Sequence, residues 1–342
     1  MRANPQRNAG FTLIELMIAV TLGLLVLAAL TSFFVRTSYN RSELERNSQQ
    51  IENGRFAIAA LRDDMMLTGF YADLKLEPPS AWTWNAPAAC VTSGNMGFVP
   101  HNPTAIPLPE VPLPILIYPL GAGAPAGCTP NILANTDVIV IRRFNTEPTP
   151  VGSVVATQTY VQISECSTDP PATPYLIDTG ANAANFTLKN RTCGAQAAVW
   201  RYREQLYYIR DYSVNAGDGI PTLVRVELDG GVSAPVPLVE GIENLRVDLG
   251  VDNDGDGTPD AWRRCDAASP CTTADYTNVM AAKVYVLSRT IDQSRDYTDD
   301  KTYSLGVSGT VTAASDHYKR HVYSALIAMP NRSGPREPIL AS

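Results

Sequence analysis

The sequence predicts an α+β fold, and three observations lead to that class. No proline interrupts the chain between Phe11 and about Leu67, which favours one continuous helix. The second half of the chain holds short runs of β-branched and aromatic residues bounded by Gly, Pro or Asn, a pattern typical of strands joined by turns. A proline-rich stretch separates these two parts. We therefore expect a long N-terminal helix packed on a mainly antiparallel β-sheet head with a long proline-rich loop.

These observations divide the 342 residues into five segments. Residues 1–10 precede the helix, residues 11–35 form its apolar half, and residues 36–70 form its amphipathic half. Residues 71–135 form the proline-rich irregular region, and residues 136–342 form the β-rich globular head. The chain is long enough to bury a core of its own.

The apolar half of the helix is long enough to cross a membrane. Residues 11–35 are apolar or neutral except for Glu15, and as a helix they would be about 37 Å long. That length spans a hydrocarbon core of about 30 Å. A cleavable secretory signal fits less well, because its apolar core is shorter and carries no acid. A plain membrane anchor stays open, since an acid near the end of a span can reach water or headgroups.

The amphipathic half of the helix carries a regular apolar stripe. Leu44, Ile51, Ile58 and Met65 recur every seven residues, and Leu61 lies close to the same face. This spacing predicts a helix whose stripe packs on the head or on a partner. Gly69 is the expected terminator.

Proline dominates the region that follows. The stretch from Glu77 to Pro130 holds 12 of the 26 prolines, including PLPEVPLP at residues 107–114. Such a stretch cannot run as a helix or as a central strand. We expect a loop that wraps the head, with extended or polyproline segments that could meet a partner. A solvated spacer is the alternative.

Seven later segments are predicted to be strands of a mainly antiparallel sheet. They share alternating apolar residues and turn residues at their ends, and they cover residues 137–144, 154–163, 204–212, 223–230, 244–251, 278–290 and 320–329.

Composition and charge narrow the function. The hydrophobic fraction of 45% and the charged fraction of 18% are ordinary for a globular protein with one membrane segment. The formal net charge is -7, and no basic cluster forms a patch, so we expect no nucleic acid partner.

All six cysteines lie beyond the membrane segment, at positions Cys90, Cys128, Cys166, Cys193, Cys265 and Cys271. None forms a CxxC pair, which argues against zinc ribbons and thioredoxin-like redox motifs. An even number suits disulfides in an oxidising compartment such as a bacterial periplasm. Sequential pairing is the simplest of the many possible schemes, and reduced buried thiols are the alternative.

The segment VDNDGDGTPD indicates a cation site. Asp252, Asp254, Asp256 and Asp260 alternate along it, and the carbonyl of Thr258 is a further ligand. Calcium prefers several oxygen ligands, and the loop resembles the first nine positions of an EF-hand loop. Arg263 stands where that loop has its last glutamate, so water or Asp266 would complete the coordination. The alternative is a metal-free turn rich in Asp and Gly.

No catalytic constellation is evident. His317 and His321 are four residues apart but lack the glutamate of an HExxH motif, and we expect surface histidines. No GxSxG elbow, phosphate-binding glycine loop or dinucleotide fingerprint occurs. The sequence therefore predicts a protein that is not an enzyme.

The string GFTLIELMIAV, residues 10–20, resembles the processing site of type IV prepilins and pseudopilins. The resemblance implies that a membrane peptidase removes residues 1–10 as a leader by cutting after Gly10, and that the new terminus, Phe11, is N-methylated. Cleavage would remove Arg2 and Arg7 and take the net charge from -7 to -9. The resemblance also implies that Glu15 is the assembly residue. We expect its carboxylate to pair with a freed α-amine at Phe11, within one helix or between neighbouring subunits.

A second resemblance covers the last 140 or so residues. The series YYIRDY, LVEGIENLRVDLGVDNDGDG, NVMAAKVYVLSRT and RHVYSALIAMPNR is similar in order and spacing to the PilW family of minor pilins. It implies a type IV pilin-like fold and a low-copy subunit in the priming or tip complex of a type IV pilus. No independent match covers the region from about Glu77 to Ala198.

The resemblances also imply partners and a location. The partners would be other minor pilins and the major pilin through the N-terminal helix, the prepilin peptidase and methyltransferase, and a tip adhesin. The protein would sit in the inner membrane with a single pass and its head in the periplasm, and would then enter the pilus at the cell surface. Arg2 and Arg7 precede the span while Arg36 and Arg41 follow it, so the positive-inside rule does not set the orientation.

Three other functions stay open at this point. A type II secretion pseudopilin belongs to the same class of structural proteins. A calcium-dependent surface adhesin or binding module would use the acidic loop. An anchored enzyme is the third, although the sequence offers no constellation for it.

Overall fold

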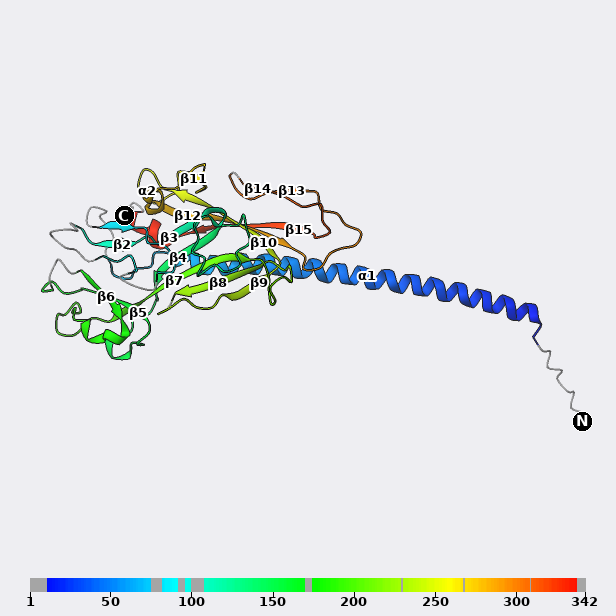
Figure 1. The fold of residues 1–342 in the computed structure, drawn as a ribbon, viewed down its shortest axis with the longest axis horizontal. Helices are drawn as coiled ribbons and strands as arrows, with labels where there is room; N and C mark the ends of the chain where they lie inside the picture. The colour runs from blue at the N-terminus through cyan, green and yellow to red at the C-terminus, as the bar shows by residue number, and fades with distance from the viewer. Residues whose placement is uncertain are drawn as a thin grey trace, which may run out of the picture. The chain divides into compact units, whose positions relative to one another are not determined.

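The computed structural model describes residues 11–74, 82–91, 96–99, 108–169, 174–228, 230–266, 268–307 and 309–336. Its fold is α+β, as predicted, with one long helix and mostly antiparallel strands (Figure 1). The leader of residues 1–10, with Gly10, lies outside the described residues. The chain separates into two compact units, Met1–Gln49 and Gln50–Ser342, so the division falls inside the predicted amphipathic half of the helix.

Helix α1 (Leu13–Met66) is 54 residues long and agrees with the predicted helix to within two residues at its start and one at its end. It ends as the sequence predicts, because Gly69 has a φ of +73°, a conformation that glycine adopts without strain. The last turn tightens as Leu67 N donates to the Asp64 carbonyl and Thr68 N donates to the Met65 carbonyl. The Gly69 N–H then donates to the Arg142 carbonyl, which starts the path into the head.

The buried face of α1 differs from the predicted stripe. Leu61 and Met65 are buried as expected and Ile58 is half-buried, but Leu44 and Ile51 are 70% and 42% exposed. A seven-residue repeat drifts by about 20° per repeat on a straight α-helix, so it cannot keep one face over three repeats. The buried row instead follows steps of three and four residues, and it consists of Gln50, Gly54, Ala57, Leu61 and Met65.

Small residues in this row let the helix approach the head closely. A Cβ on Gly54 would lie 2.2 Å from the ring of Tyr323, so only glycine fits without a shift of that ring. One turn earlier, Gln50 Nε2 donates to the carbonyls of Ser288 and Lys319 at 2.9 and 3.0 Å. The segment of α1 from Gln50 onward is therefore fixed by shape and by hydrogen bonds as well as by apolar burial.

The larger sheet has seven antiparallel strands in the order β3-β4-β7-β5-β6, with β8 also paired to β7 and β9 paired to β8. Its strands are β3 (Ile115–Tyr118), β4 (Val138–Phe144), β5 (Thr159–Ile163), β6 (Tyr175–Thr179), β7 (Val199–Arg210), β8 (Thr222–Leu228) and β9 (Val236–Glu240).

The second sheet has four antiparallel strands in the order β11-β10-β12-β15. These are β10 (Ile242–Val251), β11 (Ala261–Arg263), β12 (Val279–Arg289) and β15 (Arg320–Ala328). The buried residues of α1 share one hydrophobic core with both sheets, for example Leu61 with Ile141 of β4 and Val284 of β12. The helix is therefore the element around which the two sheets form a single core.

Most of the predicted strands are confirmed, and the differences have local causes. The segment 154–163 forms a strand only from Thr159, because a turn precedes it in which the Gln158 N–H donates to the Val155 carbonyl. The prediction missed β6, β9 and β11, and also the short strands at residues 302–304 and 310–312. Strand β9 was not predicted because it contains Pro237, and a proline inside an apolar run argues against a strand. Proline is tolerated in β9 because this strand lies at the edge of the sheet.

The proline-rich region is less irregular than expected. It contains β1 (Thr83–Asn85) and β2 (Glu110–Pro112), which pair in parallel, and the edge strand β3. The prediction that proline excludes a helix and a central strand is consistent with these positions. The extended segments expected in this loop thus include short strands, which tolerate a proline at their ends and edges.

A buried ion pair ties this region to the larger sheet. Arg142 of β4 and Glu204 of β7 lie 2.6 Å apart with side-chain exposures of 0% and 4%. The remaining donors of Arg142 go to the carbonyls of Leu113 and Pro87, and Glu204 accepts from the Cys90 N–H. The side-chain hydrogen bonds that this pair makes outside the sheet therefore fall on the proline-rich chain.

A long excursion, residues 290–319, separates β12 from β15 and carries the hairpin β13 (Thr302–Ser304) and β14 (Thr310–Thr312). Arg320 fixes its base through ion pairs with Glu243, Asp299 and Asp316. The two remaining α-helices are short, α2 (Thr273–Thr277) and α3 (Pro330–Ser333).

The six cysteines form three disulfides, Cys90–Cys128, Cys166–Cys193 and Cys265–Cys271. This is the sequential scheme, and no cysteine is free. The alternative of reduced buried thiols does not hold in this structure.

We expect the Arg142→Ala variant to lower the free energy of unfolding by about 3–5 kcal/mol, because it leaves the Glu204 carboxylate buried without its partner. The measurement is denaturant unfolding of the purified full-length chain in detergent with its disulfides intact. The matched control is Arg203→Ala on β7, whose pair with Glu227 is partly exposed and should cost about 1 kcal/mol or less. Equal losses for the two variants would contradict this account.

Candidate functional site

The start of α1 is a capping box built on Thr12 and Glu15. The Thr12 N–H and hydroxyl both donate to Glu15 Oε2 at 2.9 Å, and the Glu15 N–H donates to Thr12 Oγ1 at 3.4 Å. Reciprocal bonds of this kind satisfy N–H groups that a helix start leaves without a partner. The sequence analysis missed this role of Thr12, although the T-x-x-E spacing is the signal for it.

The capping box gives the Glu15 carboxylate a defined place in a single chain. It lies in the first turn of α1, where the positive end of the helix dipole favours an anion. Phe11, next to it, is 92% exposed. The amine partner predicted for Glu15 arises only on cleavage after Gly10, so that pairing stays a prediction.

The apolar half of α1 is long and apolar enough to cross a membrane by length and composition, and its most apolar window is fully exposed in the described structure. Its hydroxyl groups are satisfied within the helix. Thr21 Oγ1 donates to the Met17 and Ile18 carbonyls, and Thr31 Oγ1 donates to the Leu27 carbonyl. Glu15 is the one charged side chain between Phe11 and Val35.

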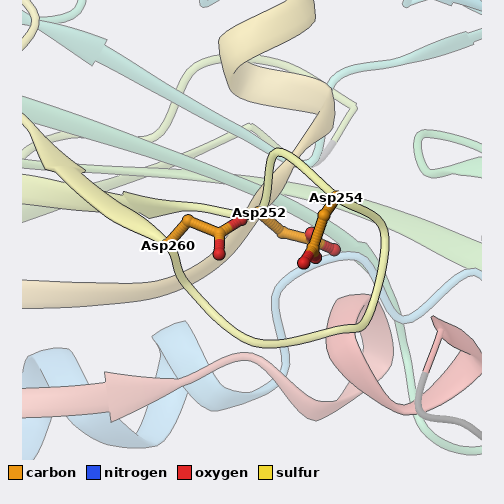
Figure 2. Close-up of side chains that lie close together, drawn as sticks. All are labelled: Asp252, Asp254 and Asp260. Carbon is orange, nitrogen blue, oxygen red and sulfur yellow. The ribbon is translucent and has the colours of Figure 1, made fainter.

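The acidic loop connects β10 to β11, so strands flank it and the helix-loop-helix of an EF-hand is absent there. Figure 2 shows Asp252, Asp254 and Asp260 on this loop. One oxygen from each carboxylate lies within 4.8 Å of the other two. Three of the five predicted ligands thus come together.

Asp252 is the innermost of the three, with 1% of its surface exposed. Burial alone would raise the pKa of its carboxyl, but hydrogen bonds from the Gly255 and Gly257 N–H groups and the charge of Arg336 hold that pKa below its usual value. Arg336 Nη1 lies 3.3 Å from Asp252 Oδ2. The group is therefore an anion with a guanidinium beside it.

Asp256, the fourth predicted carboxylate ligand, lies differently, and the carbonyl of Thr258 stays a prediction. Asp256 Oδ1 accepts from the N–H and the hydroxyl of Thr258 at 2.7 and 2.6 Å, and this carboxylate is not part of the group of three. Asp266, considered as a completing ligand, pairs with Arg264 at 3.3 Å. The Asx-type bonds of Asp256 are a turn geometry that spacing alone did not reveal.

The three grouped carboxylates fit a hard cation in part. Their oxygens are the ligand type that calcium prefers, but calcium takes about six to eight of them. The ligands beyond Asp252, Asp254 and Asp260 would have to come from backbone carbonyls and water. Arg336 competes with a cation for Asp252, which favours weak binding.

The two histidines do not form a site. His317 and His321 are both exposed, as expected. His317 Nδ1 lies 2.6 Å from the Tyr297 carbonyl, and the His321 ring packs edge-on against Tyr323.

Comparisons with known proteins match both ends of the chain. The family described as type IV pilus-assembly protein W matches residues 206–331, from β7 to α3. The prokaryotic N-terminal methylation motif matches residues 5–31, which hold Gly10, Phe11 and Glu15. A comparison with curated proteins finds no match.

A search of solved structures finds a type IV-like pilin from Thermus thermophilus, with 12% identity over 58% of this chain and 79% of that one and a TM-score of 0.29. A likeness of this size carries no argument, and the fold assignment rests on the helix and strands described above. The two family matches together have the order that the sequence analysis predicted, a methylation motif on the apolar helix and a PilW region in the β-rich head. The chain therefore carries a PilW-type region in its head and a prokaryotic N-terminal methylation motif on its apolar helix, the two features that the sequence analysis predicted for a type IV pilin.

Proposed function

We propose that this protein is a minor pilin that acts in the assembly of type IV pili as a structural subunit without enzymatic activity, in the complex that primes the fibre or caps its tip. The observation that carries the proposal is the single carboxylate of Glu15, placed by Thr12 at the start of an otherwise apolar helix. The family matches at both ends support the same function.

Electrostatics gives Glu15 its role in this proposal. A carboxylate inside a bilayer costs about 3 kcal/mol on insertion scales, and such groups are usually paired. The capping box supplies N–H and hydroxyl donors but no positive charge. Cleavage after Gly10 would supply one as the α-amine of Phe11. Because each subunit would then carry one anion and one cation at the same depth, neighbouring subunits can satisfy each other within the membrane.

The disulfides support a location for the head. Three disulfides, all beyond α1, support an oxidising compartment, and we place the head in the periplasm before assembly. Its partners would be the major pilin and other minor pilins through α1, and a tip adhesin. The prepilin peptidase and methyltransferase would process the chain at Gly10 and Phe11.

We expect the Glu15→Leu variant to be cleaved normally but to be lost from purified fibres, because it lacks the anion that pairs with the amine. Immunoblotting of sheared pili and of membranes measures the two steps separately. Thr21→Val is the matched control, since it removes a polar group whose bonds are internal to the helix. A cleaved Glu15→Leu chain present in fibres at the wild-type level would refute the assembly role of this carboxylate.

A deletion strain tests the proposed function itself. Loss of surface pili while the major subunit is still made, with recovery by the wild-type chain, is the expected result. Normal pili together with a secretion defect would favour a type II pseudopilin instead. Normal pili with loss of surface adhesion would favour an adhesin.

We also propose that the acidic loop binds calcium through Asp252, Asp254 and Asp260, with low affinity. Calorimetry of the full-length chain in detergent, titrated with calcium chloride, should give a binding heat that Asp260→Ala abolishes. Asp256→Ala is the matched control and should keep most of the heat, because its carboxylate is bonded to Thr258 instead. No heat from the wild-type chain would end this proposal.

A further inference from the structure

Strand β15 leaves one edge of the four-stranded sheet open. It runs for nine residues, and within the described part of the chain it pairs only with β12 (Figure 1). A long unpaired edge offers a row of N–H and C=O groups to any extended chain that reaches it. The edge is therefore a surface on which another strand can be added.

The other edges of the two main sheets are protected in ways that β15 is not. Strand β3 lies between Pro114 and Pro119, and β9 contains Pro237. Strand β11 has three residues and β6 has five. Short strands and prolines are the devices that prevent unwanted pairing, and β15 contains no proline. Of the edge strands of the two main sheets, β15 is therefore the one best able to accept a further strand.

The register shows which backbone groups face outward. At the two ends of the β12–β15 ladder, Met329 N donates to the Met280 carbonyl and Thr290 N donates to the Lys319 carbonyl. In an antiparallel ladder, hydrogen-bonded and non-hydrogen-bonded residue pairs alternate. The backbone N–H and C=O groups of the odd-numbered residues of β15 therefore point toward β12, and those of the even-numbered residues point away from it. The Tyr303 hydroxyl donates to the outward carbonyl of Arg320, which agrees with this alternation. Val322, Ser324 and Leu326 therefore present backbone groups that bond to none of the described residues.

The side chains along this edge favour an apolar and acidic partner. Leu326 is 61% exposed, and Ser324 beside it is exposed too. Neither β12 nor β15 contains an acidic residue, although the chain as a whole has a net charge of -7. On the helix side of the edge, Gly54 of α1 packs against the Tyr323 ring of β15, and the next residue along the helix, Arg55, is exposed. Within the described residues Arg55 has no ion-pair partner.

We propose that the β15 edge binds an extended segment of a neighbouring pilin subunit as an added strand, with an apolar side chain against Leu326 and a carboxylate against Arg55. The inference rests on the proposed function, because it places the contact between subunits of a fibre or of the priming complex. Backbone bonds from Val322, Ser324 and Leu326 would supply affinity, and the two side-chain contacts would supply specificity.

Photocrosslinking of the full-length chain in piliated cells tests this contact. With p-benzoylphenylalanine in place of Leu326, we expect an adduct that mass spectrometry maps to another pilin subunit. The same probe in place of Val307 is the matched control, because that side chain is 64% exposed but lies on the β13–β14 excursion. Adducts of equal yield from both positions, or an adduct of the Leu326 probe that contains only lipid, would overturn the proposal.

Two substitutions, each added to the Leu326 probe, test the mode of binding. Ser324→Pro removes an outward N–H and should abolish the adduct, whereas Ser324→Ala should keep it. Arg55→Glu should also abolish it, with Arg62→Glu, exposed two turns further along α1, as its control. Intact disulfides and protease resistance report folding of each variant. A folded Ser324→Pro or Arg55→Glu chain with the full adduct contradicts strand addition with a charged contact.

The failures of the two proposals are distinguishable. If the wild-type chain is absent from pili and its deletion leaves pili normal, the proposed function fails. If the chain enters pili and supports their assembly while the Leu326 probe gives no protein adduct, only the inference about the β15 edge fails.

Discussion

The structure depends on one helix that must be stable in two different environments, a lipid bilayer and the core of the head. In its first half the backbone and the hydroxyls of Thr21 and Thr31 bond within the helix, so that a lipid environment costs little. From Gln50 onward the same helix provides one side of the core shared by both sheets. The absence of proline from α1 is what allows these two requirements to be met by continuous backbone.

The sequence was most informative where one physical rule dominated. Hydropathy and the glycine at position 69 predicted the helix and its end, and alternation predicted the long central strands. The helix face was harder, because a seven-residue repeat was visible while the small residues Gly54 and Ala57 carry no hydrophobic signal. The short strands β6 and β9 were missed because strand statistics do not apply well at the edges of a sheet.

The acidic loop shows why ligand type is easier to predict than ligand geometry. Alternating carboxylates were visible in the sequence, and three of them meet. Whether a carboxylate turns inward depends on bonds to its own loop, as for Asp256, and on charges far along the chain, as for Arg336 beside Asp252. Neither is readable from spacing. The capping role of Thr12, by contrast, could have been predicted from the T-x-x-E spacing between Thr12 and Glu15.

The order of the disulfides bears on how the protein reaches its location. Each bond joins cysteines that are neighbours among the six, separated by 38, 27 and 6 residues. If the head crosses a membrane from its N-terminal side, each crosslink can close as soon as its second thiol emerges. No cysteine has to wait for a later partner, so oxidation in order of emergence yields the native set without reshuffling by an isomerase.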